Sequence, residues 1–154
     1  MTLDLAQFTA PMKRAIELAK QAATEGEVPV AAVLVDDQGE IIFEAYNKKE
    51  QLNDPTGHAE ILLLKGASQK LGKWRLSDYT VVSTLEPCFM CAGALSHARI
   101  KRCVFGAFDQ KFGAMGSLYN IPADERLNHR FEAISGVLEQ ECRQLLVDFF
   151  KQKR

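Results

Sequence analysis

Two short motifs constrain the fold of this chain more than any other feature of its sequence. The first is His-Ala-Glu, from His58 to Glu60, and the second is Pro-Cys-Phe-Met-Cys, with its thiols at Cys88 and Cys91. A zinc ion that keeps its fourth position for a water molecule needs three nitrogen or sulfur ligands from the protein. The imidazole and the two thiols meet that need, so the fold has to bring both motifs to one point. Glu60 is then left as a carboxylate beside the metal, where it can carry protons.

The cysteine motif is expected at the start of a helix. Pro87 follows an apolar, strand-like run from Val81 to Leu85, and proline is typical of the first position of a helix. Cys88 and Cys91 would then lie three residues apart, on one face of the first turn. The positive end of the helix dipole favours the thiolate forms of both side chains.

The histidine motif is expected at a second helix start. His58 and Glu60 are only two residues apart, so on the flank of a helix their side chains would diverge. They can converge only at a helix tip, and the polar segment Asn53-Asp54-Pro55-Thr56 places such a tip just before them. We therefore expect two helix N-termini to meet at one ion.

Two other interpretations of these motifs stay open. A Cys-x-x-Cys pair that follows a strand and opens a helix also describes a thioredoxin-like redox pair. A closed structural zinc site would need a fourth ligand, for which the sequence offers His97, His129, Cys103 and Cys142. The last two lie in apolar patterns typical of a core, and neither histidine has a partner at metal-ligand spacing. The open site with three ligands is therefore favoured.

The composition predicts a single domain over residues 1–154. A hydrophobic fraction of 47% with 25% charged residues is that of a globular protein with its own core. No apolar run approaches the ~20 residues that cross a bilayer, so we expect no membrane span. The first residues lack a basic region followed by an apolar one, so we expect no export signal. Free thiols available for a metal fit a reducing, cytoplasmic location.

Charge is distributed unevenly along the chain, although the net charge is only −1. Residues 1–56 contain five lysines and arginines and ten acidic residues, whereas residues 57–154 contain fourteen and ten. From charge alone, solvated helix faces explain the excess in the second part. The alternative is a local basic face that binds nucleic acid.

Apolar periodicity and turn residues predict an α/β chain. The expected order is helix, hairpin, helix, strand, helix, strand, loop and helix, which predicts a mixed sheet covered by helices on both faces. The segments are a helix from Met12 to Ala23 that stops at Gly26, strands over 29–35 and 41–47, a helix over 57–71 closed by Gly72, a strand over 79–85, a helix over 88–98, a strand over 102–107, an irregular segment over 108–130, and a last helix with an apolar stripe from Cys142 to Phe150.

With these residues in place, the chain resembles the cytidine deaminase-like zinc superfamily, whose signature is H-x-E followed by P-C-x-x-C. Within it, the chain is most similar to the bacterial tRNA adenosine deaminases that form inosine at the wobble position. The resemblance covers nearly the whole chain, and the stretch from Phe105 to Ser117 and the terminal helix point to the tRNA branch. It also includes residues 27–30, Asn47, residues 54–56, both zinc motifs, residues 92–94 and 97–100, Asn128, His129, Phe149 and Phe150.

The resemblance implies a fold, a cofactor and an assembly. The expected fold is a three-layer α-β-α sandwich with a mixed central sheet of about five strands. The expected cofactor is one Zn²⁺ per subunit, held by His58, Cys88 and Cys91. Members of the family are typically homodimers with their active sites near the interface, and the expected macromolecular partner is the anticodon stem-loop of a tRNA.

The resemblance also implies an activity, hydrolytic deamination of adenosine to inosine. Zinc would activate a water for attack on C6 of adenine, and Glu60 would protonate the ring nitrogen and the departing ammonia. Without the family, Asn47 is a turn residue at a strand end and Glu86 is a carboxylate that caps a helix. With the family, the expected substrate contacts are Asn47, Val28, Pro29, the backbone near Ala59 and Glu86, and, for the flanking nucleotides, Asp109 and Lys111.

Two residues depart from the family pattern. Gly57 stands where alanine is common, and it could loosen the helix start. Phe108 stands where a polar residue is common, and it could supply a stacking face for nucleic acid or cover apolar surface. The rival functions are a deaminase of a free base or nucleoside, such as guanine, cytosine or cytidine, and a zinc-stabilised binding module without catalysis.

Overall fold

The computed structural model describes residues 3–153. Met1, Thr2 and Arg154 lie outside the described residues, and with them part of the N-terminal stretch in which no export signal is expected. The helices and strands follow the order that the sequence predicts, with one strand added near the end. In chain order they are η1 (Leu5–Phe8), α1 (Thr9–Thr24), β1 (Ala31–Val35), β2 (Ile41–Tyr46), α2 (Ala59–Leu71), β3 (Thr80–Leu85), α3 (Phe89–His97), β4 (Arg102–Ala107), η2 (Ile121–Ala123), β5 (Glu132–Ile134) and α4 (Glu139–Gln152).

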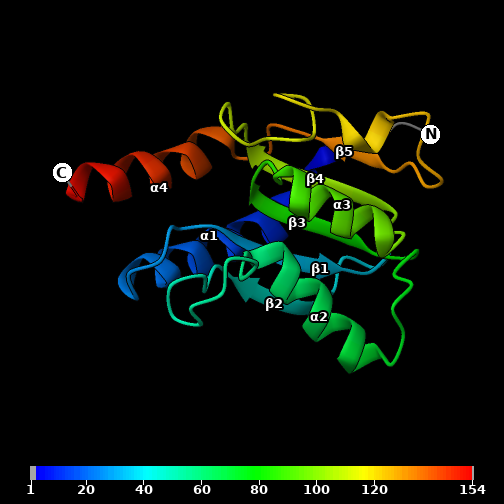
Figure 1. Cartoon of the computed structure of the whole chain (residues 1–154), viewed down its shortest axis with the longest axis horizontal. Coiled ribbons are helices and arrows are strands. Elements are labelled where there is room, and N and C mark those ends of the chain that lie inside the picture. The colour runs from blue at the N-terminus through cyan, green and yellow to red at the C-terminus, as the bar shows by residue number, and fades with distance from the viewer. Residues whose placement is uncertain (1–2, 154) are drawn as a thin grey trace.

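The five strands form one mixed sheet in the order β2-β1-β3-β4-β5 (Figure 1). β1 pairs antiparallel with both β2 and β3, whereas β3, β4 and β5 run parallel to one another. The central register places Val82 of β3 opposite Val33 of β1 on one side and opposite Val104 of β4 on the other. The expected mixed sheet of about five strands is confirmed.

Helices cover both faces of this sheet, which confirms the three-layer α-β-α sandwich. α2 and α3 lie over the face turned toward the viewer in Figure 1, and α1 lies behind the sheet. Val33 and Val35 of β1 pack with α1 and α4 in one apolar cluster, whereas Ala32 and Leu34 pack with α2 and α3 in the other. Every residue of β1 is buried because both of its faces are covered, as the continuously apolar run predicts.

The strand that the sequence analysis missed is β5, which pairs parallel with β4 from Arg102 to Val104. It contains three residues, two of them exposed, so it lacks the apolar alternation that marks a strand. The long segment after β4 is irregular as predicted, apart from the single 3-10 turn η2.

Several observed helices and strands are one or two residues shorter at an end than predicted, because the terminal residues of the predicted run are caps or turns. The first helix instead begins at Thr9, three residues before the predicted start. Within residues 3–153, no helix is both long and apolar enough to cross a membrane.

Candidate active site

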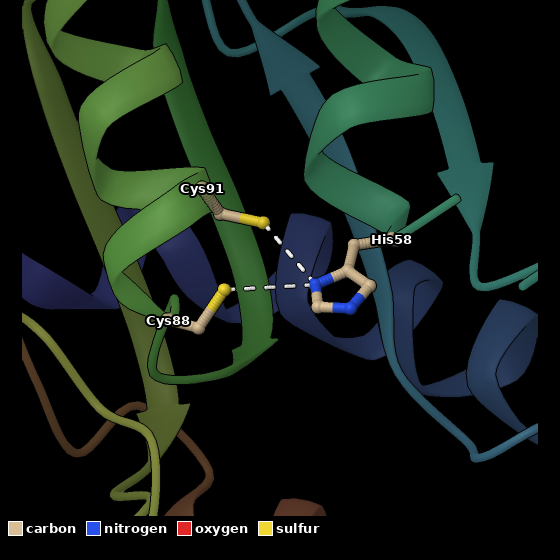
Figure 2. Close-up of side chains that lie close together, drawn as sticks. All are labelled: His58, Cys88 and Cys91. Carbon is tan, nitrogen blue, oxygen red and sulfur yellow. Dashed lines mark hydrogen bonds between the residues drawn. The ribbon is translucent and has the colours of Figure 1, made fainter. Parts of the chain in front are cut away.

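The three expected zinc ligands converge where α2 and α3 begin (Figure 2). His58 is the N-cap residue of α2, Cys88 is the N-cap residue of α3, and Cys91 lies in the first turn of α3. The Nδ1 atom of His58 is 3.6 Å from the sulfur of Cys88 and 3.5 Å from the sulfur of Cys91. Two helix N-termini therefore meet at one point, as the spacing of the motifs predicts.

These distances fit a tetrahedral zinc ion. With bond lengths of about 2.3 Å to sulfur and 2.0–2.1 Å to nitrogen, two ligands at the tetrahedral angle lie about 3.6 Å apart. All three donor atoms lie within 4.8 Å of one another, and among the residues that the structure describes no fourth His, Cys, Asp or Glu joins this group. The donor set is therefore that of an open zinc site.

The other candidate ligands have different surroundings. Cys103 and Cys142 are buried in the two apolar clusters, as expected of core residues. His97 is exposed at the end of α3. The Nε2 atom of His129 lies 2.8 Å from the carbonyl oxygen of Ile100, and its ring stacks on Phe131. A closed structural zinc site is therefore not supported.

The start of α3 differs in one detail from the prediction. Pro87 precedes the N-cap and is not the first helical residue, because Cys88 keeps an extended backbone with φ −73° and ψ 174°. This conformation places Cys88 at the helix tip, ahead of Cys91 in the first turn. His58 has the same kind of extended N-cap backbone, with φ −71° and ψ 151°.

The two thiols are not equivalent. The hydrogen bond from Cys91 is the main cause that lowers the pKa of Cys88 to about 4, with a further contribution from His58. The same contact and burial raise the pKa of the Cys91 thiol. The hydrogen bond with Cys88 in turn raises the pKa of His58. The pair is thus arranged around a thiolate, which is the form of cysteine that binds a metal.

Glu60 lies in the first turn of α2, with only 4% of its surface exposed. Burial raises the pKa of this carboxyl to about 7, because desolvation disfavours its charged form. It lines the same cavity as His58 and Cys88. The helix-tip arrangement predicted for His58 and Glu60 is therefore confirmed, and the carboxyl faces the space that the metal site borders.

The cavity has a volume of about 350 Å³, which is near the lower end for ligand-binding pockets. Most of the expected site residues line it, whereas Pro29, Lys111 and the buried Cys91 do not. The sequence analysis also missed a set of mainly apolar lining residues. The lining consists of the expected Val28, Asn47, His58, Ala59, Glu60, Glu86, Cys88 and Asp109, together with Val30, Pro55, Leu85, Phe89, Met90 and Phe112.

Pro29 and Lys111 lie elsewhere. Pro29 contributes to a groove beside α1 and α4, on the other face of the sheet from α2 and α3. Val28 and Val30 line the cavity on either side of it, because successive residues of an extended segment point in opposite directions. Lys111 is exposed at the surface of the loop that follows β4.

The side chain of Glu86 organises the loop after β4. This buried carboxylate accepts hydrogen bonds from the backbone N–H groups of Asp109 at 3.0 Å, Met115 at 2.9 Å and Ser117 at 3.0 Å, and from the hydroxyl of Ser117. At Gly113 a Cβ atom would stand 2.3 Å from the Glu86 carboxyl, so only glycine allows this close approach. Glu86 is therefore a loop anchor and not a helix cap.

A second buried carboxylate organises the loop between β2 and α2, which contributes Pro55 to the cavity lining. Glu27 has no exposed surface and accepts hydrogen bonds from the backbone N–H groups of Glu50 at 3.0 Å and Gln51 at 2.7 Å. Asn47 adds two contacts, since its amide donates to the carbonyl of Val28 and its oxygen accepts from the N–H of Lys49. Two loops that contribute lining residues to the cavity are thus each held by a buried carboxylate.

The two departures from the family pattern now have structural explanations. Gly57 precedes the N-cap of α2, and a Cβ there would come within 3.1 Å of the carbonyl oxygen of Asp54 and 3.2 Å of Cα of Lys49. It serves close packing of the loop and lies outside the helix. The ring of Phe108 packs edge-on against Phe105 with 5.3 Å between centroids, so it covers apolar surface and does not line the cavity.

Comparisons with known proteins agree with this geometry. Residues 7–107 match the cytidine and deoxycytidylate deaminase zinc-binding region. The chain is 50% identical over 143 residues to the tRNA-specific adenosine deaminase of Haemophilus influenzae, covering 93% of this chain and 83% of the relative. It is also 50% identical to the enzyme of the same name from Bacillus subtilis, covering 93% and 88% of the two chains.

A solved structure from a study of A-to-I editing by tRNA:A34 deaminases at the wobble position of transfer RNA superposes on this chain with a TM-score of 0.86. The two sequences are 40% identical, and the match covers 90% of this chain and 99% of the other. The extent of these matches and the motifs that they include determine the family of the chain. It belongs to the zinc-binding cytidine and deoxycytidylate deaminase family, in the branch of the tRNA-specific adenosine deaminases.

Proposed function

We propose that this chain hydrolyses adenosine to inosine at the wobble position of a tRNA anticodon. The observation that carries the proposal is the open three-ligand metal site with the buried carboxyl of Glu60 in the same cavity. Identity of up to 50% with tRNA-specific adenosine deaminases supports the choice of substrate.

The reaction converts adenosine and water into inosine and ammonia. His58, Cys88 and Cys91 would hold the zinc ion, which would supply the Lewis acidity that makes water nucleophilic near neutral pH. Glu60 accepts a proton from that water and donates it to the ring nitrogen N1 of adenine. It would then take the proton of the hydroxyl group added at C6, which becomes the carbonyl of inosine, and pass it to the amine, which leaves as ammonia. The buried position of the Glu60 carboxyl in the same cavity as the metal ligands suits this exchange, because a proton carrier has to lie within reach of both the water and the base.

The remaining cavity residues orient the base and exclude water. Val28, Val30 and Leu85 give the cavity apolar walls, which suit a planar base turned out of its stack. Asn47 and the backbone at Ala59 are the proposed polar contacts to the nucleoside. At Glu86 the proposed contact is through the backbone, since the carboxylate is engaged by the loop after β4. Asp109 and Lys111, on that loop, are the proposed contacts to neighbouring nucleotides.

The partner, assembly and compartment are parts of the same proposal. The partner is the anticodon stem-loop of a tRNA, the assembly is a homodimer as in the family that the chain resembles, and the compartment is the cytoplasm. Size-exclusion chromatography with light scattering tests the assembly. A monomer at working concentration would contradict it.

A comparison of substrates tests the function. We expect the zinc-loaded chain to form inosine in an anticodon stem-loop with adenosine at the wobble position. We expect little turnover of free adenosine, guanine, cytosine or cytidine, measured under the same conditions by chromatography of the digested products. Turnover of one of the small molecules alone would show that the rival deaminase function is correct. Stoichiometric zinc without any turnover would favour the binding module.

A further inference from the structure

We propose that the ring of Phe112 is a stacking surface for the base of one nucleotide adjacent to the adenosine that enters the cavity. The inference rests on the proposed function, because it assumes that the substrate is a nucleotide within an RNA chain. It assigns the recognition of a neighbouring base to a residue for which neither the motifs nor the family resemblance predicts a role.

The surroundings of Phe112 differ from those of the other aromatic residues near the cavity. Its side chain lines the cavity and remains 60% exposed. The ring of Phe89, which also lines the cavity, is approached edge-on by Tyr119, and that of Phe108 packs on Phe105. Among residues 3–153, Phe112 takes part in no such ring pair, so its faces remain available to a ligand.

Phe112 is held in place by its own loop. The backbone N–H groups of Lys111 and Phe112 both donate to Oδ1 of Asp109, at 3.0 Å and 3.2 Å. The N–H of Asp109 donates to the buried carboxylate of Glu86, and the N–H of Gly113 donates to the carbonyl of Asp109 at 2.9 Å. A ring on a backbone fixed in this way loses little further freedom when it stacks, which favours binding.

The size of the cavity places a neighbouring base at this ring. About 350 Å³ is at the small end for a ligand pocket, which suits a single base and leaves the neighbouring bases outside. The phosphodiester chain keeps the adjacent nucleotides at the cavity mouth, where Phe112 is exposed. Exposed aromatic rings bind unpaired bases by stacking, independently of their sequence. Lys111 is the preceding residue and is also exposed, so its charge is available to a phosphate of the same RNA strand.

The experiment removes the ring from the protein and the base from the RNA. Phe112→Ala, Phe112→Trp and the control Leu118→Ala, which truncates a 53% exposed side chain of the same loop, are assayed with the zinc-loaded chain. The substrates are the intact anticodon stem-loop and two altered stem-loops. One has an abasic nucleotide immediately before the wobble adenosine, and the other has it immediately after.

We expect Phe112→Ala to lower kcat/KM on the intact stem-loop about 5- to 100-fold, mainly through KM, the range typical of one lost stacking contact. With the abasic nucleotide at one of the two positions, the alanine variant and the original chain should be nearly equal. Phe112→Trp should retain activity on the intact stem-loop, and Leu118→Ala should resemble the original chain.

Three results would overturn the inference: an equal loss on all three stem-loops, no loss on the intact one, or a changed oligomeric state of the alanine variant. The last result would assign Phe112 to an interface between copies of the chain. If the unaltered, zinc-loaded chain forms no inosine in any stem-loop, the proposed function itself fails. Activity of the unaltered chain combined with any of the three results refutes only the role of Phe112.

Discussion

At the scale of single residues, the position of the Glu60 side chain in the cavity depends on the backbone conformation at the start of α2. His58 keeps an extended conformation as the N-cap, so the carboxyl two residues later can face the same cavity. On a regular helix flank the two side chains would diverge. The cavity therefore receives a metal ligand and the proposed proton carrier from three consecutive residues.

We predict that Glu60→Ala retains zinc and loses deamination. None of the three donor atoms of the metal group belongs to Glu60, so metal content measured by mass spectrometry should stay near one ion per chain. Inosine formation in the stem-loop should fall by about 10²–10⁴-fold, the usual contribution of a positioned proton carrier. A variant with zinc and nearly normal turnover would remove Glu60 from the proton transfer.

The sequence was sufficient to predict the ligands of the site and insufficient to predict its walls. His58, Cys88 and Cys91 follow from donor chemistry and spacing, which hold whatever surrounds them. Pro29 and Val30 exchange roles because the direction of a side chain in an extended segment depends on register, which the motif does not specify. Phe112 could have been found as the second aromatic of the loop in which Phe108 was singled out, but only packing separates the two.

At the scale of elements, the most informative contact joins the end of β3 to the loop after β4. One carboxylate, that of Glu86, satisfies three backbone N–H groups and one hydroxyl of that loop. The sequence offered only a carboxylate before a helix, for which a capping role is the local interpretation. The actual partners lie more than twenty positions further along the chain, so no local pattern could have revealed them.

We predict that Glu86→Ala destabilises the fold by at least about 1–3 kcal/mol, the cost of leaving a buried hydrogen-bonding group without its partner. Urea unfolding followed by circular dichroism measures the change. The matched control is Glu132→Ala, which removes a 54% exposed carboxylate paired with Arg102 and should cost less than about 1 kcal/mol. Equal effects of the two substitutions would contradict the anchoring role of Glu86.

Helices and strands with strong apolar patterns were predicted well from the sequence. α1, β1 and α4 follow from their periodicity, since each has a face or a whole length buried in a large apolar cluster. β5 escaped prediction because its three residues are held by backbone pairing with β4 and contribute little to the core. The two helices at the site begin one or two residues later than predicted, because His58 and Cys88 are N-cap residues.

At the scale of the whole molecule, the metal site joins two helices that already pack on one face of the sheet. α2 and α3 share an apolar cluster with β1, β3 and β4, and α1 and α4 share the other. None of the three zinc ligands belongs to either cluster, although Ala59 and Ala92, which follow His58 and Cys91, do. The fold is therefore expected to persist without zinc and to gain stability when zinc binds.

We predict that removal of zinc with a chelator lowers the Tm and that added zinc restores it. At a free zinc concentration about 100 times the dissociation constant, binding contributes about 2.7 kcal/mol, which corresponds to roughly 5–10 °C for a chain of this size. Differential scanning fluorimetry measures the shift. The control is Cys88→Ser, whose Tm should respond weakly to both additions. An unchanged Tm after complete loss of the metal would contradict the coupling.

The two anchored loops have a consequence for which RNAs can react. Glu27 fixes the backbone of the loop that carries the lining residue Pro55, and Glu86 fixes the loop that carries Asp109 and Phe112. We therefore expect the opening of the cavity to keep its shape when RNA binds, so that the protein contributes little to unstacking the nucleotide. The target nucleotide then has to be unstacked by the structure of the RNA itself. Adenosines in hairpin loops, which are already unpaired, should therefore react faster than adenosines in a duplex. A fixed opening in the protein thus selects substrates by the secondary structure of the RNA.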